Sequence, residues 1–169
     1  MVLLMLTGCQ DSGVQELPVS ANEDVGIVSG LPPISELAGT PDPEIPPLPI
    51  LDRDQIALGQ EVYETHCASC HGQNLEGEPD WQVQNEDKSF RVPPHDASGH
   101  TWHHGDDQLI ESIRLGGARL PEEIGGSSNM PAFAEVLSDE EIAAVLTYIK
   151  STWPDDIRAI QWEQTIREQ

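Results

Sequence analysis

Two of the three cysteines of this chain stand three positions apart, in the run Cys67-Ala68-Ser69-Cys70-His71. Thiols at this spacing lie on one side of a helical turn, and the histidine that follows is held where its imidazole can ligate iron. The C-x-x-C-H spacing is the attachment signature of c-type haem. It predicts one covalent haem c, with thioether bonds from Cys67 and Cys70 and with His71 as an axial ligand.

Two other interpretations of the cysteine pair require a different context. A structural zinc site needs four ligands, and the only further cysteine in the chain is Cys9. A thioredoxin-like redox pair follows a strand in a βαβ unit, whereas a helical pattern precedes Cys67. Both interpretations are therefore rejected.

A helix is predicted before the haem motif, from about Asp54 to Thr65, and a second one near the C-terminus. Gly59 and Tyr63 share one face of the first helix. A glycine inside a helix costs up to ~1 kcal/mol relative to alanine, so we expect Gly59 to admit another helix at close range. The second helix begins with a capping box over residues 138–141, and its apolar side chains recur at helical spacing (Ile142, Val145, Leu146 and Ile149).

With these patterns, residues 51–153 resemble a class I cytochrome c. The resemblance implies an all-α fold, in which the N- and C-terminal helices cross around one covalently bound haem, with long irregular loops. It places the crossing at Gly59 and Tyr63 of the first helix and at Val145 and Tyr148 of the last.

The resemblance also implies a methionine as the second axial ligand, ahead of the C-terminal helix and commonly followed by proline. Met130-Pro131 fits this position, and the other two methionines, Met1 and Met5, lie in the apolar N-terminal stretch. The alternative is that Met130 is an ordinary loop residue. A haem with His and Met on its two axial positions has no open site, which predicts a single-electron carrier rather than an enzyme.

The middle of the chain corresponds less closely to the family. A short helix over residues 106–114 matches the family's middle helix. In the family, the axial histidine donates a hydrogen bond from Nδ1 to a backbone carbonyl near a proline, which fixes the tautomer of the ring. The sequence does not distinguish the carbonyls of Pro93 and Pro94, and we assign Pro94 to the cofactor site. The usual distance from the haem motif is exceeded, so residues 72–92 are predicted to form an insertion or an enlarged loop.

Four of the six histidines fall within residues 95–104. The resemblance implies that Trp102 donates its indole N–H to a haem propionate, where nearby histidines would tune the reduction potential. We favour loop packing and propionate contacts for this segment. The alternative is a second metal site, for copper or zinc, although the spacing is not a recognised metal signature. Its candidate ligands are His95, Asp96, His100, His103 and His104.

The N-terminus carries a different pattern. Residues 1–8 are apolar and end in small residues, and the run Leu6-Thr7-Gly8-Cys9 resembles the lipobox of bacterial lipoproteins, in which the cysteine is lipidated. Residues 1–9 are therefore interpreted as the remnant of a lipoprotein signal peptide, with Cys9 as the lipidation site. No positive charge precedes the run, and the alternative is a chance cysteine in an ordinary N-terminus.

Residues 10–50 are predicted to form an acidic, proline-rich tether. Residues 1–50 hold seven acidic residues, no Lys or Arg, and eight of the 14 prolines of the chain. Proline removes backbone donors and favours extended geometry, so such a stretch forms neither a helix nor a sheet interior. A coil of this length averages roughly 35 Å from end to end. The alternative for its last ten residues is an ordered coil that wraps the domain.

Beyond the predicted domain, residues 154–169 form a C-terminal extension with a helical pattern. The sequence leaves open whether this extension packs on the domain or meets a partner.

The formal net charge of −22 excludes unaided binding to nucleic acid or to anionic lipid, because both are polyanions. No stretch approaches the ~20 apolar residues of a membrane span. Residues 51–153 hold 19 acidic and six basic residues, so we expect a monomer whose redox partner has a basic docking patch. Together the patterns predict a lipid-anchored electron carrier of a bacterial extracytoplasmic respiratory chain. The alternatives are a haem enzyme or ligand-binding cytochrome in which Met130 dissociates, and a copper-handling protein that uses residues 95–104.

Overall fold

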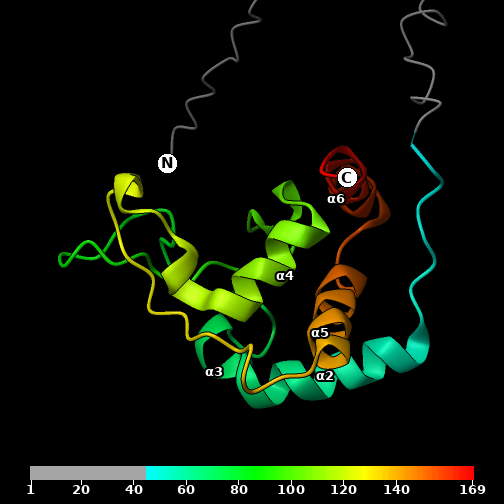
Figure 1. Ribbon diagram of the computed structural model, residues 1–169, viewed down its shortest axis with the longest axis horizontal. Coiled ribbons are helices and arrows are strands. Elements are labelled where there is room, and N and C mark those ends of the chain that lie inside the picture. The colour runs from blue at the N-terminus through cyan, green and yellow to red at the C-terminus, as the bar shows by residue number, and fades with distance from the viewer. Residues whose placement is uncertain (1–44) are drawn as a thin grey trace, which may run out of the picture. The chain divides into compact units, whose positions relative to one another are not determined.

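The computed structural model describes residues 45–169, so the predicted lipidation at Cys9 and residues 10–44 of the predicted tether lie outside the described residues. Over residues 45–169 the chain is all-α, as predicted, and its β pairing is limited to one isolated bridge between Ser89 and Ser127 (Figure 1). In chain order the helices are α2 (Arg53–His66), α3 (Ala68–His71), α4 (Asp106–Leu115), α5 (Asp139–Ser151) and α6 (Asp155–Arg167), with the 3-10 turns η1 (Thr101–His103), η2 (Gly116–Arg119) and η3 (Glu122–Ile124).

Helix α2 leads directly into the cysteine motif. The side chain of Asp52 caps its N-terminus by accepting hydrogen bonds from the N–H groups of Asp54 and Gln55, at 2.9 and 3.0 Å. The helix ends where the N–H of Cys67 donates to the carbonyl oxygen of Tyr63 at 2.9 Å. The predicted bounds of this helix therefore differ from the observed ones by one residue at each end.

Helix α5 begins at the predicted capping box. The Oγ of Ser138 accepts a hydrogen bond from the N–H of Glu141 at 3.3 Å, and the Glu141 carboxylate accepts one from the N–H of Ser138 at 2.8 Å. The apolar face predicted for this helix is buried (Ile142, Val145, Leu146 and Ile149).

Helices α2 and α5 cross at Gly59, as predicted (Figure 1). A β-carbon on Gly59 would lie 2.0 Å from the carbonyl oxygen of Ala144, so the approach requires glycine. The rings of Tyr63 and Tyr148 pack together, with centroids 5.4 Å apart. Val145 lies in the core, and it is the backbone of the preceding residue that makes the close approach.

The hydrophobic core joins α2, α3 and α5 to the loop segments that follow α3 and precede α5. Its buried members are Val62, Tyr63, Ala68, Leu75, Phe133, Leu137, Ile142, Val145, Ile149 and Trp153. Three candidate cofactor residues, Cys67, Trp102 and Met130, are partly buried against this core. The fold therefore gathers residues from three separate parts of the sequence around one apolar cluster.

The segment between α3 and η1 contains no helix or strand, which agrees with the predicted enlarged loop. Leu75, Asp80 and Lys88 adopt positive φ angles of 64°, 54° and 65°, which are uncommon for residues other than glycine. The N–H of Phe90 donates to the carbonyl oxygen of Ser127 at 2.7 Å, so the loop is tied to the segment that precedes α5.

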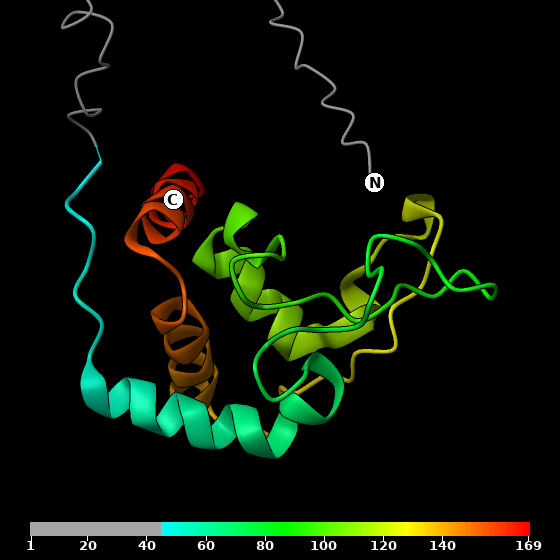
Figure 2. The same cartoon turned by 180° about the vertical axis from the view of Figure 1, so that it is seen from behind.

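The C-terminal extension packs on the domain as helix α6, beside the N-terminal end of α4 (Figure 2). Trp162 Nε1 donates to the carbonyl oxygen of Pro46 at 2.7 Å, and an Arg158 guanidinium N–H donates to that of Pro49 at 2.8 Å. Residues 45–50 of the predicted tether thus lie against the domain, which favours the ordered-coil interpretation for this stretch. Among the described residues, no helix has the length and apolar character that a membrane crossing needs.

Candidate haem site

The cysteine motif forms one tight turn at the end of α2. The N–H groups of Cys70 and His71 both donate to the carbonyl oxygen of Cys67, at 3.1 and 2.9 Å. Cys67 is half-buried and Cys70 is exposed. Tyr63 Oη donates to the carbonyl oxygen of Gly72 at 2.9 Å, so the turn is tied back to α2. Burial raises the pKa of the Tyr63 phenol above its usual range, which keeps this donor protonated.

His71 is 8% exposed and is oriented by a single backbone carbonyl. Its Nδ1 lies 2.9 Å from the carbonyl oxygen of Pro93. Because a carbonyl oxygen can only accept, Nδ1 carries the proton and Nε2 keeps the lone pair that a metal can bind. Burial lowers the pKa of His71, which favours the same neutral form. A neutral ring with a free Nε2 lone pair is the form that a metal ligand requires.

The identity of this carbonyl corrects the assignment of Pro94 as the residue that orients His71. The carbonyl oxygen of Pro94 instead accepts a hydrogen bond from Thr101 Oγ1 at 3.5 Å, and the Pro94 side chain is fully buried. Consecutive carbonyls of an extended backbone point in different directions, so Pro93 and Pro94 cannot share one role. Only the path of the loop decides which of them faces His71.

His95 stacks on the ring of His71, with centroids 4.0 Å apart and planes inclined by 22°. Its Nδ1 lies 2.8 Å from Thr101 Oγ1, and its carbonyl oxygen accepts a hydrogen bond from Trp153 Nε1 at 2.7 Å. Burial, followed by the neighbouring His71, lowers the pKa of His95 well below its usual range. Sequence reasoning missed this stack, because no local pattern reports which ring lies against which.

Met130 lies between η3 and α5 and is anchored through its backbone. Its carbonyl oxygen accepts a hydrogen bond from the N–H of Gly117 at 2.8 Å, and its N–H donates to Ser128 Oγ at 3.2 Å. Gly116 has a φ of 57°, and a β-carbon there would lie 2.4 Å from the Met130 carbonyl oxygen. A glycine is therefore needed to hold this loop close. The role of Met130 as the second axial ligand stays a prediction.

Two buried donors from the segment between α3 and α4 have no acceptor among the described residues: Trp102 Nε1 and Arg91 Nε. A buried N–H without a partner costs ~1–3 kcal/mol, so such groups indicate a ligand that carries acceptor oxygens. A haem brings two carboxylates and fits this requirement. Trp102 was predicted for such a contact, whereas Arg91 was missed. The sequence does offer one indication of Arg91, which is one of only six basic residues within residues 51–153.

A copper or zinc site was the alternative interpretation of the histidine segment. No three His, Cys, Asp or Glu side chains of the described residues converge there as metal ligands. The described residues therefore give the copper or zinc alternative no support, and the rings make other contacts. His100 stacks on Trp81 with centroids 5.1 Å apart, His103 stacks on Trp102 at 3.7 Å, and His104 Nδ1 lies 2.8 Å from Gln108 Oε1.

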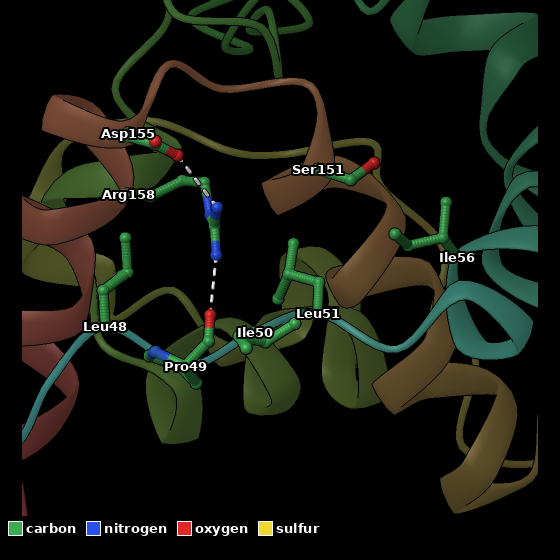
Figure 3. Close-up of a pocket in the computed structure, with 8 residues that line it drawn as sticks. All are labelled: Leu48, Pro49, Ile50, Leu51, Ile56, Ser151, Asp155 and Arg158. Carbon is green, nitrogen blue, oxygen red and sulfur yellow. Dashed lines mark hydrogen bonds and ion pairs between the residues drawn. The ribbon is translucent and has the colours of Figure 1, made fainter.

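A groove lies elsewhere on the domain, between residues 48–51, Ile56 and the junction of α5 with α6 (Figure 3). Across this groove, the Arg158 guanidinium joins the Asp155 carboxylate to the carbonyl oxygen of Pro49. None of the candidate haem residues lines it. The groove is therefore separate from the candidate site.

Comparison with known proteins gives one match. A family model described as cytochrome c matches residues 56–153. The matched segment begins within α2, ends just after α5, and includes both the cysteine motif and Met130. Helix α6 and residues 45–55 lie outside it. No curated protein and no solved structure matches the chain.

Proposed function

Because this chain belongs to the cytochrome c family, we propose that it is a single-electron carrier whose haem c is ligated by His71 and Met130. Cys67 and Cys70 would hold the haem through two thioether bonds. When bound, the haem supplies a reversible one-electron couple between ferric and ferrous iron. One observation carries the proposal. His71 belongs to the turn that carries both thiols, and the carbonyl oxygen of Pro93 holds the proton of its ring on Nδ1.

The proposed ligands favour electron transfer over catalysis. With the Met130 thioether on the second axial position, neither position is open to a substrate. Methionine ligation also favours ferrous iron and raises the reduction potential relative to two imidazoles. The carbonyl oxygen of Pro93 makes His71 a more basic ligand and holds the plane of its ring.

Arg91 and Trp102 would bind the haem carboxylates. Their buried N–H groups have no acceptor among the described residues, and a carboxylate oxygen would satisfy each of them. Such bonds would both position the haem and offset the carboxylate charge close to the iron.

Spectra of the holoprotein and of two Met130 variants test the ligand set. Ferric wild type should show the weak charge-transfer absorption of an iron–sulfur bond, and Met130→Ala should lose it. Met130→His should also lose the band while keeping six ligands, and its reduction potential should fall. An unchanged band in Met130→Ala refutes the ligand assignment.

Carbon monoxide separates the carrier from the alternative of a haem enzyme or ligand-binding cytochrome. Reduced wild type should resist carbon monoxide because both axial positions are filled, whereas reduced Met130→Ala should bind it. Rapid binding by wild type would favour the alternative.

We further propose that the redox partner presents a basic docking patch to a monomeric carrier. Residues 51–153 carry 19 acidic and six basic residues. This excess of acidic residues makes the domain strongly negative, and four of the eight Lys and Arg side chains are paired with carboxylates. These pairs are Arg114–Asp139, Lys150–Asp106, Arg158–Asp155 and Arg167–Glu163.

We also propose that lipidated Cys9 anchors the carrier on the outer side of a bacterial cytoplasmic membrane or in the periplasm. The proposal rests on the lipobox-like run that ends at Cys9. Growth of a bacterial host with radioactive palmitate should label the full-length protein and leave a Cys9→Ser control unlabelled. An unlabelled wild type would exclude the anchor.

A further inference from the structure

Helix α6 docks on the domain through side chains that are polar and yet buried. Gln161 is 2% exposed and Thr165 is 7% exposed. Burying such groups costs free energy unless they are hydrogen-bonded, so the contact has a defined geometry. Helix α6 lies outside the residues that match the cytochrome c family, and nothing in the haem site described above explains it.

Two side chains of α6 and the side chain of its C-cap residue, Glu168, bind the backbone of three consecutive residues, which form the junction between η1 and α4. Gln161 Nε2 donates to the carbonyl oxygen of His104 at 3.2 Å, Glu168 Oε1 accepts from the N–H of Gly105 at 3.0 Å, and Thr165 Oγ1 accepts from the N–H of Asp106 at 3.2 Å. Because these bonds fall on three successive residues, they fix both the position and the direction of the backbone at the junction.

The Asp106 carboxylate reinforces the junction. Its Oδ1 accepts a hydrogen bond from Gln161 Nε2 at 2.7 Å and one from Thr165 Oγ1 at 3.1 Å. The same oxygen pairs with the ammonium group of Lys150 in α5. Helices α4, α5 and α6 therefore meet at one carboxylate, and such a satisfied network favours a single arrangement.

Trp102 lies two residues before this junction, in η1. The N–H of His104 donates to the carbonyl oxygen of Thr101 at 3.2 Å, so a fixed His104 also fixes the turn that carries Trp102. The indole N–H of Trp102 is buried and has no acceptor among the described residues. Its position in this turn decides whether it can reach a haem carboxylate.

We propose that Gln161, Thr165 and Glu168 are positioning residues, which hold Trp102 where its indole N–H meets a haem carboxylate. The inference rests on the proposed function, because it requires the haem and the donor role of Trp102. A hydrogen bond from an N–H offsets part of the carboxylate charge. Its loss would therefore stabilise ferric iron and lower the reduction potential.

Potentiometric titration of the full-length holoprotein, at one pH and one ionic strength, tests the inference. The shift of the reduction potential in Trp102→Phe gives the full effect of losing the indole donor. Thr165→Val keeps the shape of the side chain but removes its hydroxyl, and we expect the equilibrium constant for reduction to fall about threefold, or about 28 mV at 59 mV per tenfold. Thr165→Ser keeps the hydroxyl and should behave as wild type.

Two further variants serve as controls. Trp162→Phe removes the bond from α6 to Pro46 without touching the junction, so its potential should equal that of wild type. Gln161→Leu removes the three bonds to His104, Asp106 and Thr165, and it takes the place of Thr165→Val should that variant fail to incorporate haem.

The double variant, Trp102→Phe with Thr165→Val, distinguishes a positioning role of Thr165 from an independent effect on the reduction potential. Its potential should equal that of Trp102→Phe alone, because a positioning residue has no effect once its target is gone. An additive shift, or a wild-type potential in Thr165→Val while Trp102→Phe is shifted, overturns the positioning role and leaves the proposed function intact. A wild-type reduction potential in Trp102→Phe overturns both the role of Trp102 and this inference. The proposed electron carrier is tested separately, by the spectra of the Met130 variants.

Discussion

Gly59 and Ala144 lie so close together that a β-carbon on Gly59 would be 2.0 Å from the carbonyl oxygen of Ala144. The obstacle is backbone and cannot rotate away, so helices α2 and α5 would have to separate. Gly59→Ala should lower the free energy of unfolding of the holoprotein by more than about 3 kcal/mol, measured by denaturant titration. Gln60→Ala, at the exposed neighbouring position, should change it by less than about 0.5 kcal/mol. Similar losses in both variants would contradict this account of the crossing.

Trp153 and Trp162 offer a matched pair of substitutions. Each indole N–H donates to a backbone carbonyl at 2.7 Å, but Trp153 is buried, whereas the bond from Trp162 to Pro46 is exposed to water. Trp153→Phe leaves the carbonyl of His95 without its donor, so we expect a loss of about 1–3 kcal/mol in the free energy of unfolding. Trp162→Phe should cost less than about 1 kcal/mol, because water replaces the lost donor. The reverse order of the two losses would be inconsistent with the observed packing.

The capping box of α5 predicts a pH-dependent contribution to stability. Hydrogen bonds from the N–H and Oγ of Ser138 lower the pKa of Glu141 below its ordinary value of 4.5. A carboxyl group with a lowered pKa in the folded state stabilises the fold above its unfolded pKa, and this contribution is lost as the pH falls through the folded pKa. The advantage of wild type over Glu141→Gln should therefore be constant near neutral pH and shrink below about pH 4.5.

Chemical denaturation at a series of pH values measures this difference. Glu140→Gln removes a charge from the same helical turn without touching the capping box, and it serves as the control. A Glu141→Gln difference that does not narrow in acid would exclude the proposed linkage.

The acidic surface predicts opposite salt effects for redox reagents of opposite charge. Reduction of a cationic hexaammine complex by the ferrous protein should slow as ionic strength rises, because salt screens the attraction to the negative domain. Oxidation by anionic hexacyanoferrate should become faster under the same conditions. Stopped-flow rates over a salt series measure both effects. Equal salt dependence for the two reagents would remove the electrostatic argument for a basic partner.

The helices were predictable from local patterns. The cap at Ser138, the buried stripe of α5 and the extent of α2 each depend on residues within a few turns of one another. The crossing at Gly59 was also predictable, because an interior glycine needs a reason to be tolerated in a helix. The class of cofactor followed from the five residues that end at His71, and the family match agrees with it.

The candidate site was predictable only in part. The family resemblance implied that Trp102 donates to a haem propionate, and its indole N–H has no acceptor among the described residues, but Arg91 was not identified as a second such donor. It did not distinguish Pro93 from Pro94, and it left open a metal site for which the described residues group no three ligands. In each case the missing information was the direction of a side chain or carbonyl in a long irregular loop, where no periodicity applies.

The sequence by itself determined the helical segments, the covalent cofactor and the acidic charge, because each of these is a property of residue types and short spacings. Only the tertiary structure decided which carbonyl orients His71, which ring stacks on it, and how α6 binds the junction between η1 and α4. These contacts join residues up to 63 positions apart. Their geometry depends on how the whole loop packs, and no local pattern in the sequence carries that information.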